Sequence, residues 1–480
     1  MTDYTGEMAE FIAETKFENL PSNVIHQAKL LILDVMGCAV SGYSHDRGMI
    51  CREVVKEFGG NPEATILGGD NRTSCVYAAY ANSNMASALD NEETFVNAAH
   101  FSSTTVFAAL ALAERGNDSG RELIKAVAIG YEFVARLWAS TGYAGEIVEG
   151  KVVSTPVVGW PAPMGGVASA CSVLKLDKEK VFNALGIAGH YSPLPSAHLW
   201  RSAQELPLIK YKDNGWMALG GVMSALLANK GYTGHSGILD GEAGYWKMYG
   251  AKSCDYNVMV EGLGDQWWIM ETSFKPWPAC RHIHHSLTAL SKIKNKHNVK
   301  HDEVERITVK GSFMEHPQFH DQEPEGAVNP QFSAPHVLAM LMLNIPPGVD
   351  WYQPEIMRDP KVISLRKKIK IKIDPRIMTD QIARQISQHP RIIKEIPTTV
   401  EVLAKGQVFS ETVKYAKGDP WDPEFRISDE ELKDKFKLNA SSLLPLSFEW
   451  KNKIDEAIDK CFRLEDLENV NDLTALMMRQ

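Results

Sequence analysis

Paired cysteines and clustered basic residues are both missing from this sequence of 480 residues. Its seven cysteines are scattered without a CxxC pair, a pattern typical of a reducing compartment and not of a disulfide framework or a structural zinc site. No basic stripe accompanies the formal net charge of −9. Because a nucleic-acid surface needs clustered positive charge, we expect no nucleic-acid partner.

Targeting and membrane signals are also missing. The first residues, MTDYTGEMAEFIAETKF, are acidic and amphipathic, without the basic and apolar regions of a signal peptide. Charge or glycine interrupts apolar stretches such as VMSALLANKG before they reach the roughly 18–20 residues that a membrane span needs. These features predict a cytoplasmic protein with no membrane partner.

The common catalytic motifs are absent as well. The sequence contains no GxxxxGK[ST] phosphate loop, no GxGxxG turn, no GxSxG elbow and no HExxH pair. The sequence therefore contains no motif that would indicate a nucleotide-binding enzyme, a serine hydrolase or a zinc protease. What the chain does have is 44% hydrophobic residues, enough for a large core divided between two or three domains.

Residues 1–270 have the pattern of packed helices. In PSNVIHQAKLLILDVMGCAVSG, apolar side chains recur three and four residues apart, and Ser22 is placed to cap the helix start. Later segments such as MGGVASACSVLKL carry glycine and alanine, which allow helices to approach closely. We predict a helical domain over this range.

A mixed pattern replaces the helical one after residue 270. Alternating, β-branched segments predict strands at 303–311, 367–375 and 398–418, the last as a hairpin around a glycine turn. A helical pattern returns at Ser428, whose acidic first turn complements the helix dipole.

We therefore predict a mainly α fold with a discontinuous arrangement. Residues 1–270 and 428–480 form one large all-helical domain, and residues 271–427 form an inserted α+β lid domain. The C-terminal helices are expected to pack against the first bundle.

Polar residues gather at three predicted helix starts. The segment ALDNEETFVNAAHF contains Asp90, Thr94 and His100, and ELPLIKYKDNGW contains Lys210 and Lys212. A third group, in FKPWPACRHIHHSLTAL, comprises Lys275, Cys280, Arg281, His282, His284 and His285. A capped, solvated helix start would also explain the acidic cluster, and surface positions would explain the lysines, so these alternatives stay open.

The histidine-rich segment does not have the spacing of a metal site. His282 and His284 are two residues apart, and His284 and His285 are adjacent. Side chains at these offsets diverge on a helix, where positions three or four apart share a face. We predict no metal ligands here.

Several segments of this sequence occur in the same order as in a known protein family. They include ALDNEETFVNAAHFSSTTVFAALALAE, GWMALGGVMSALLANKGYTG, FKPWPACRHIHHSLTAL and NPQFSAPHVLAMLML. Together they resemble the MmgE/PrpD family, which includes 2-methylcitrate dehydratases, cis-aconitate decarboxylases and an iminodisuccinate epimerase. The resemblance spans nearly the whole chain and implies the discontinuous helical fold, a homodimer and no organic cofactor.

The resemblance also implies roles for individual residues. The family's Asp, Thr and His fall on Asp90, Thr94 and His100, at spacings of four and ten. Its active-site lysine falls best on Lys210, and on Lys212 if the alignment shifts by two. At the start of the lid, the matching residues are Lys275, Cys280 and His284.

The expected chemistry is proton transfer beside a carboxylate of a small polycarboxylate substrate. His100 would exchange the proton, Asp90 would orient its ring or bind a substrate hydroxyl group, and cationic groups would clamp the carboxylates. The predicted catalytic residues are His100, Asp90, Lys210 and Lys275, and the predicted substrate-binding residues are Thr94, Lys212, Cys280, Arg281, His282, His284 and His336.

Two positions depart from the family pattern. Pro156 stands where many relatives have a histidine, and His336 stands where they have a tyrosine. We therefore expect a substrate different from 2-methylcitrate. The sequence favours a lyase that acts on a di- or tricarboxylate by dehydration or decarboxylation. An epimerase of a substituted succinate and a catalytically silent dimer that binds a metabolite or a protein remain the alternatives.

Overall fold

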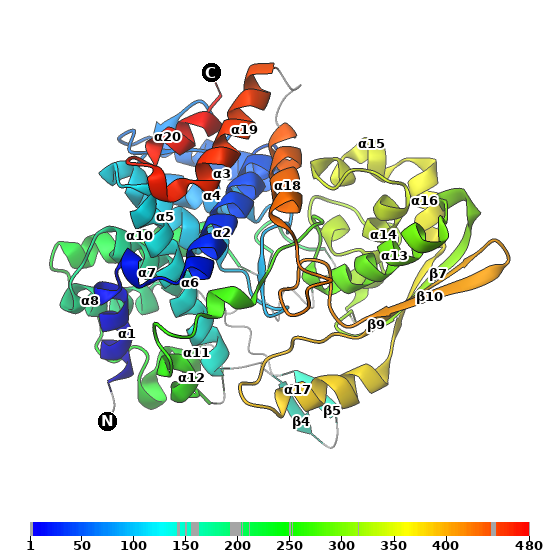
Figure 1. Cartoon of the computed structure of the whole chain (residues 1–480), viewed down its shortest axis with the longest axis horizontal. Coiled ribbons are helices and arrows are strands. Elements are labelled where there is room, and N and C mark those ends of the chain that lie inside the picture. The colour runs from blue at the N-terminus through cyan, green and yellow to red at the C-terminus, as the bar shows by residue number, and fades with distance from the viewer. Residues whose placement is uncertain are drawn as a thin grey trace.

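The computed structural model places two bodies side by side, a large helical body and a smaller mixed one (Figure 1). It describes residues 3–141, 145–148, 151–154, 163–192, 203, 205–210, 212–248, 251, 253–314, 316–442 and 448–479. One hydrophobic core takes its buried residues from 8–274 and again from 432–477. A second core takes them from Leu206 and from 277–425. The mainly α fold with an inserted α+β lid is confirmed, although the exact boundaries at 270 and 427 stay predictions.

Helices build the larger body. They are α1 (Tyr4–Glu14), α2 (Ser22–Gly42), α3 (Asp46–Phe58), α4 (Cys75–Ala86), α5 (Ser102–Gly116), α6 (Gly120–Thr141), α7 (Met164–Val173), α8 (Lys178–His190), α10 (Asn214–Asn229), α11 (Tyr245–Met248), α12 (Tyr256–Val260), α18 (Asp429–Ser441), α19 (Phe448–Phe462) and α20 (Asn471–Thr474). Close approaches explain the small residues of α7 and α10, because a Cβ atom on Gly221 would lie 2.6 Å from the backbone of Gly166.

Helix α2 is the central helix of this body. It is long and apolar enough to cross a membrane by length and composition, so the expectation that no segment would reach that length was wrong. However, 83% of its apolar window is buried inside the protein, as expected for a core helix. Pro21, not Ser22, occupies the N-cap position.

Helix α18 returns the chain to the helical body and lies beside α2 (Figure 1). As the sequence indicates, Ser428 caps it, with the Glu431 amide donating to the Ser428 hydroxyl and the Glu431 carboxylate accepting from the Ser428 amide. On the buried face of α18, the Lys435 ammonium lies 2.6 Å from the Asp34 carboxylate of α2. This buried ion pair joins the two ends of the chain.

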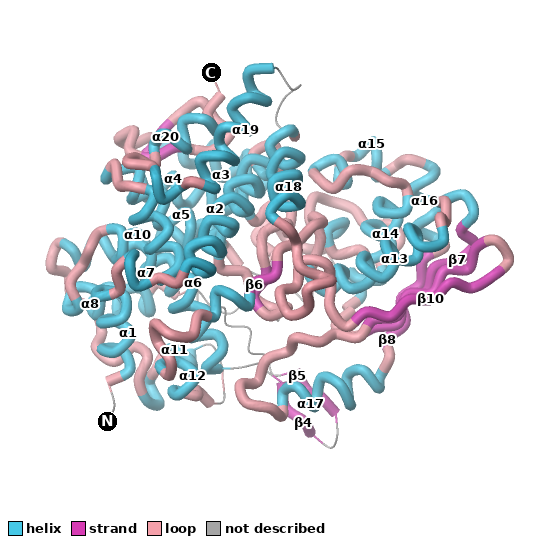
Figure 2. Tube along the Cα trace, viewed as in Figure 1, coloured by secondary structure: helices cyan, strands magenta, loops and turns pink. Residues whose placement is uncertain are grey.

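The lid contains a four-stranded sheet of β7 (Val304–Gly311), β8 (Ile369–Ile373), β9 (Thr398–Ala404) and β10 (Gln407–Val413). The strand order is β10-β9-β7-β8, with only β7 and β8 parallel to each other. All three predicted strand regions are therefore present, and Lys405 and Gly406 form the hairpin turn with positive φ angles. Figure 2 shows helices packed beside these strands. The lid helices are α13 (His284–His297), α14 (Ala334–Met342), α15 (Pro354–Met357), α16 (Pro360–Lys367) and α17 (Ala383–Ile386).

Short antiparallel ribbons interrupt the helical pattern. They pair β1 (Ala64–Thr65) with β2 (Arg72–Thr73), β4 (Gly145–Val148) with β5 (Lys151–Ser154), and β3 (Thr94–Phe95) with β6 (Thr272–Ser273). The β3–β6 ribbon lies where the helical body meets the lid, and Figure 2 shows β6 between the two bodies. It joins two segments that are far apart in the sequence.

Candidate active site

The β3–β6 ribbon brings the acidic cluster to the start of the lid. Thr94 pairs with Ser273, which places Lys275 against the loop before β3. The Lys275 ammonium lies 2.9 Å from the Asp90 carboxylate and 2.7 Å from the Asp90 carbonyl oxygen. Both side chains are buried. Asp90 has a φ angle of +53°, a conformation that residues other than glycine adopt rarely.

Asp90 is ionised in this environment. Burial by itself would raise the pKa of its carboxyl group. The positive charges of Lys275 and Lys210, together with His100, outweigh burial and hold the pKa far below its usual range. Asp90 is therefore a fixed negative charge among buried cations.

His100 is held as a neutral base. Its Nδ1 atom lies 2.6 Å from the carbonyl oxygen of Glu93. Because a carbonyl oxygen only accepts, Nδ1 carries the proton and Nε2 keeps a lone pair when the ring is neutral. Burial and the nearby Lys275 charge lower the pKa of His100 well below its usual value.

The orientation of His100 differs from the prediction. Its Nε2 atom lies 3.8 Å from the Asp90 carboxylate, which is longer than a hydrogen bond. The carbonyl of Glu93, and not the side chain of Asp90, orients the ring. Asp90 acts on His100 through its charge.

Glu93 caps helix α5 from outside the helix. Its carboxylate accepts the amide hydrogens of Phe101 and Ser102, at 2.6 and 2.8 Å, and also accepts from the Ser102 hydroxyl. Burial nevertheless raises the pKa of Glu93 to about 7. The capping interpretation of the acidic run is correct for Glu93, but this helix start is buried and not solvated.

Both candidate lysines are buried, so the surface-lysine alternative is wrong. The Lys210 ammonium donates to the carbonyl of Ser87 at 2.7 Å, and that of Lys212 donates to the carbonyl of His100 at 2.5 Å. Burial lowers the pKa of each lysine to about 8. Since both approach the acidic loop, the contacts leave the choice between them open.

Arg47, at the start of α3, is a buried cation that the sequence reasoning missed. Its guanidinium donates to the Asn84 side chain at 2.6 Å and to the Lys212 carbonyl at 3.3 Å. It thereby supports the lysine segment and adds positive charge beside it. No motif in the surrounding sequence distinguished it from an ordinary helix residue.

Cys280 and Arg281 occupy the turn that opens the lid, and their roles in substrate binding stay predictions. Burial raises the pKa of the Cys280 thiol to about 12, so this thiol stays protonated. The Arg281 guanidinium donates to the Asn97 side chain at 2.9 Å and pairs with Asp419. Through these contacts Arg281 links the lid to the helical body.

Three of the histidines are arranged by the packing of the lid. The His282 ring is tilted against the Phe313 ring, with ring centroids 5.3 Å apart, and His284 contacts the Ala279 carbonyl at 3.1 Å. His336 contacts the Trp351 carbonyl at 2.7 Å. Their roles in substrate binding stay predictions, and Pro156 lies outside the described residues.

Two hydroxyl groups near the acidic loop complete the site. The Thr94 hydroxyl is buried and has no hydrogen-bond partner among the residues that the structure describes. The Tyr352 hydroxyl donates to the Pro278 carbonyl, and burial together with the Asp90 charge raises its pKa. Tyr352 was missed because its segment, VDWYQPE, has no recognisable motif.

Two family models each match a different part of this chain. The family model of the MmgE/PrpD N-terminal domain matches residues 6–255, and that of the MmgE/PrpD C-terminal domain matches residues 277–463. The chain belongs to the MmgE/PrpD family. The resemblance noted in the sequence is thus confirmed.

Relatives of this MmgE/PrpD protein include three cis-aconitate decarboxylases. The human protein is 26% identical over 98% of this chain and 94% of its own length. The mouse protein is also 26% identical, over 98% and 93%. The Aspergillus terreus protein is 25% identical over 71% of this chain and 72% of its own length.

The acidic loop also forms the one group of potential metal ligands found among the described residues. Ligand atoms of Asp90, Glu92 and His100 all lie within 4.8 Å of one another. The ammonium group of Lys275, however, already contacts Asp90. A metal ion here would meet that positive charge at close range, which disfavours metal binding at this group of this MmgE/PrpD protein.

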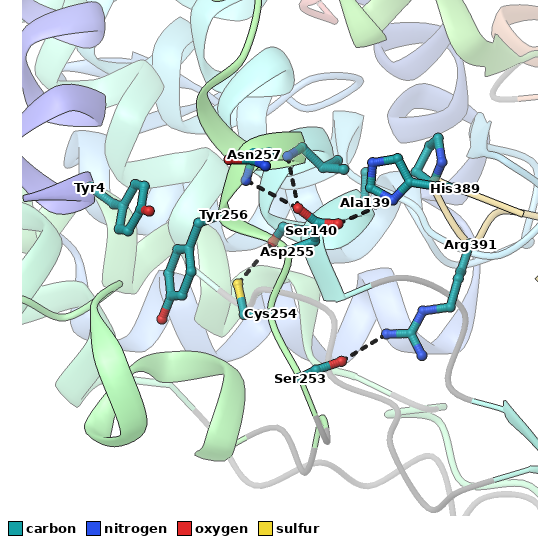
Figure 3. A pocket seen from close by; sticks show the side chains of 12 residues that line it. Tyr4, Ala139, Ser140, Ser253, Cys254, Asp255, Tyr256, Asn257, His389 and Arg391 are labelled. Carbon is teal, nitrogen blue, oxygen red and sulfur yellow. Dashed lines mark hydrogen bonds and ion pairs between the residues drawn. The ribbon is translucent and has the colours of Figure 1, made fainter. Parts of the chain in front are cut away.

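A separate pocket of about 460 Å³ lies between the helical body and the lid segment 389–391 (Figure 3). Arg391 donates to the Ser253 hydroxyl at 3.0 Å, and His389 lies 3.1 Å from the Asp255 carboxylate. None of the predicted site residues lines this pocket. Its contacts attach the lid of this MmgE/PrpD protein to the helical body.

Proposed function

We propose that this protein is a lyase that acts on a small di- or tricarboxylate, with decarboxylation of a cis-aconitate-like acid as its first candidate reaction. The observation that carries the proposal is the neutral imidazole of His100, whose Nε2 lone pair lies beside an ionised aspartate and buried lysines. The named relatives support the choice of decarboxylation.

The charge of the site supports an anionic substrate. Four buried cations, Arg47, Lys210, Lys212 and Lys275, are grouped around the loop that carries Asp90. Buried charges are costly unless they are paired. Two or three substrate carboxylates would add negative charge beside these cations and would be held by charge-assisted hydrogen bonds.

The residues also suit proton transfer next to a carboxylate. In dehydration, His100 would take a proton from the carbon beside a carboxylate while the lysines stabilise the negative charge that develops there. In decarboxylation of an unsaturated acid, the electron pair left by carbon dioxide shifts along the carbon chain, and another carbon takes up a proton. Both reactions need a group that transfers a proton and positively charged side chains that bind the carboxylates.

The test is a substrate panel followed by proton NMR in heavy water, using the wild type and His100→Asn. We expect carbon dioxide release from cis-aconitate, and weaker turnover of 2-methylcitrate because of the departures at Pro156 and His336. Deuterium incorporation without loss of a group would instead indicate an epimerase. Binding without exchange or turnover of citrate, methylcitrate, aconitate or substituted succinates would contradict the lyase proposal.

A further inference from the structure

Glu92 is a buried carboxyl group whose role the mechanism above leaves unassigned. Its side chain is fully buried, and neither carboxyl oxygen has a hydrogen-bond partner among the residues that the structure describes. A ligand atom of Glu92 lies within 4.8 Å of both Asp90 and His100. The carboxyl group therefore faces the centre of the candidate site.

The surroundings of Glu92 favour its protonated form. An ionised carboxylate without donors is costly in a buried position, and the negative charge of Asp90 within 4.8 Å opposes a second negative charge. Positive charges on Lys275 and Lys210 act in the opposite direction, but burial dominates and raises the pKa of Glu92. Lys435, which also approaches this loop, donates to Asp34 and to the Asn91 carbonyl.

The two other acid–base groups beside Glu92 are not set up to give a proton to the reacting carbon. The proton of neutral His100 is on Nδ1, where it is bonded to the Glu93 carbonyl. Asp90 is ionised and bonded to Lys275. Glu92 is the carboxyl group beside them that combines burial, unpartnered oxygens and proximity to the base.

We propose that Glu92 is a second catalytic residue, the acid that donates a proton to the substrate. His100 serves as the base in a dehydration, and in a decarboxylation it passes a proton back to Glu92 after each turnover. This inference rests on the proposed lyase function. In decarboxylation, the bond to the leaving carboxylate breaks, its electron pair forms a new double bond, and the original double bond takes the proton from Glu92. Carbon dioxide leaves, and the Glu92 carboxylate regains a proton from solvent through His100.

With Glu92 as the acid and His100 as the base, the proton transfers of a dehydration also balance. His100 Nε2 takes the proton from carbon, the hydroxyl group leaves as water with the proton of Glu92, and imidazolium and carboxylate result. Because the two groups lie within 4.8 Å, the imidazolium can return its proton to Glu92 and reset the site.

The first experiment measures the protonation of Glu92 without relying on turnover. Infrared difference spectra of the wild type and Glu92→Gln at neutral pH should show the carbonyl stretch of a protonated carboxylic acid that the variant lacks. Absence of that band in the folded wild type would overturn the proposal, whatever the substrate of the enzyme proves to be.

The second experiment separates the roles of acid and base. Glutamine has the shape of a protonated glutamate but transfers no proton, so Glu92→Gln should lower kcat at least about 100-fold with little change in melting temperature. Glu92→Asp should restore part of the activity. For a substrate with an exchangeable proton, Glu92→Gln should still catalyse deuterium exchange, which His100→Asn should not.

A matched control removes a different buried carboxylate. Glu114 accepts from Thr65 and Thr474 in the helical core, so Glu114→Gln should lose stability but keep kcat within a few-fold. If the wild type turns over and Glu92→Gln matches it within twofold, the role of Glu92 is refuted while the lyase function stands. If the wild type turns over none of the panel, the lyase function fails and the infrared result still decides whether Glu92 holds a proton.

Discussion

The ammonium group of Lys275 lies 2.9 Å from the carboxylate of Asp90, although the two residues are 185 positions apart in the chain. Neither side chain is exposed to water. This ion pair joins the acidic loop of the helical body to the first residues of the lid. The positive charge of Lys275 also helps to hold the pKa of Asp90 far below its usual range.

Lys275→Met should therefore affect both stability and activity. Removing one partner of a buried ion pair leaves an uncompensated charge and typically costs about 3–5 kcal/mol. Denaturant unfolding measures that loss. The double variant Lys275→Met with Asp90→Asn should recover much of the stability but no activity, whereas recovery of both would show that the pair is structural only.

His100→Asn should abolish turnover while retaining the fold. The asparagine amide can still donate to the Glu93 carbonyl, but it has no basic nitrogen in place of Nε2. We expect kcat to fall by about 10² to 10⁴, the usual contribution of a general acid or base. A melting temperature that drops sharply while kcat is unchanged would instead identify a structural histidine.

Activity should fall as the pH rises through about 8. Lys210 and Lys212 both have pKa values lowered to about 8 by burial. Each carries its positive charge below that pH and loses it above, so carboxylate binding should weaken on the alkaline side. The measurement is kcat/KM against pH with the proposed substrate.

Arginine variants identify which of these lysines is responsible. Arginine keeps its charge across this range, so Lys210→Arg should move the alkaline fall to higher pH if Lys210 binds the substrate. The same shift in Lys212→Arg alone would assign the role to Lys212. If Lys210→Arg and Lys212→Arg are both active and kcat/KM still falls at the same alkaline pH in each, the prediction is contradicted.

Lys435→Met should weaken the acidic loop from a distance. Lys435 donates to Asp34 and, at 2.7 Å, to the carbonyl of Asn91, so its removal frees a buried acid and loosens the residue next to Asp90. We expect losses of both unfolding free energy and kcat. Lys433→Met, on the same helix but in a surface pair with Glu430, should cost about 0–1 kcal/mol and leave kcat unchanged.

The oligomeric state remains a prediction from the sequence. The family resemblance and the glycine- and alanine-rich helices suggest a homodimer with a large apolar interface. Light scattering at micromolar concentration should give twice the 53.4 kDa mass of one chain. A mass near that of a single chain would contradict it.

Much of the fold could be predicted because its elements leave local patterns. The repeat of three and four residues marked α2, strand alternation marked β7 and β9, and Ser428 with its acidic turn marked the start of α18. Polar clusters at predicted helix starts also marked Asp90, His100 and the lysines as candidates, and the family resemblance gave them roles.

By itself, the sequence determined the order of these elements, the family, and the residue types available for chemistry. Only the tertiary structure decided how the polar groups meet. The β3 and β6 strands have two residues each, too few to show a period, yet their pairing brings Lys275 to Asp90. Likewise, only the folded loop shows that the carbonyl of Glu93 orients His100 and that the Glu92 carboxyl group has no hydrogen-bond partner among the described residues. Such contacts depend on long-range packing and not on local spacing.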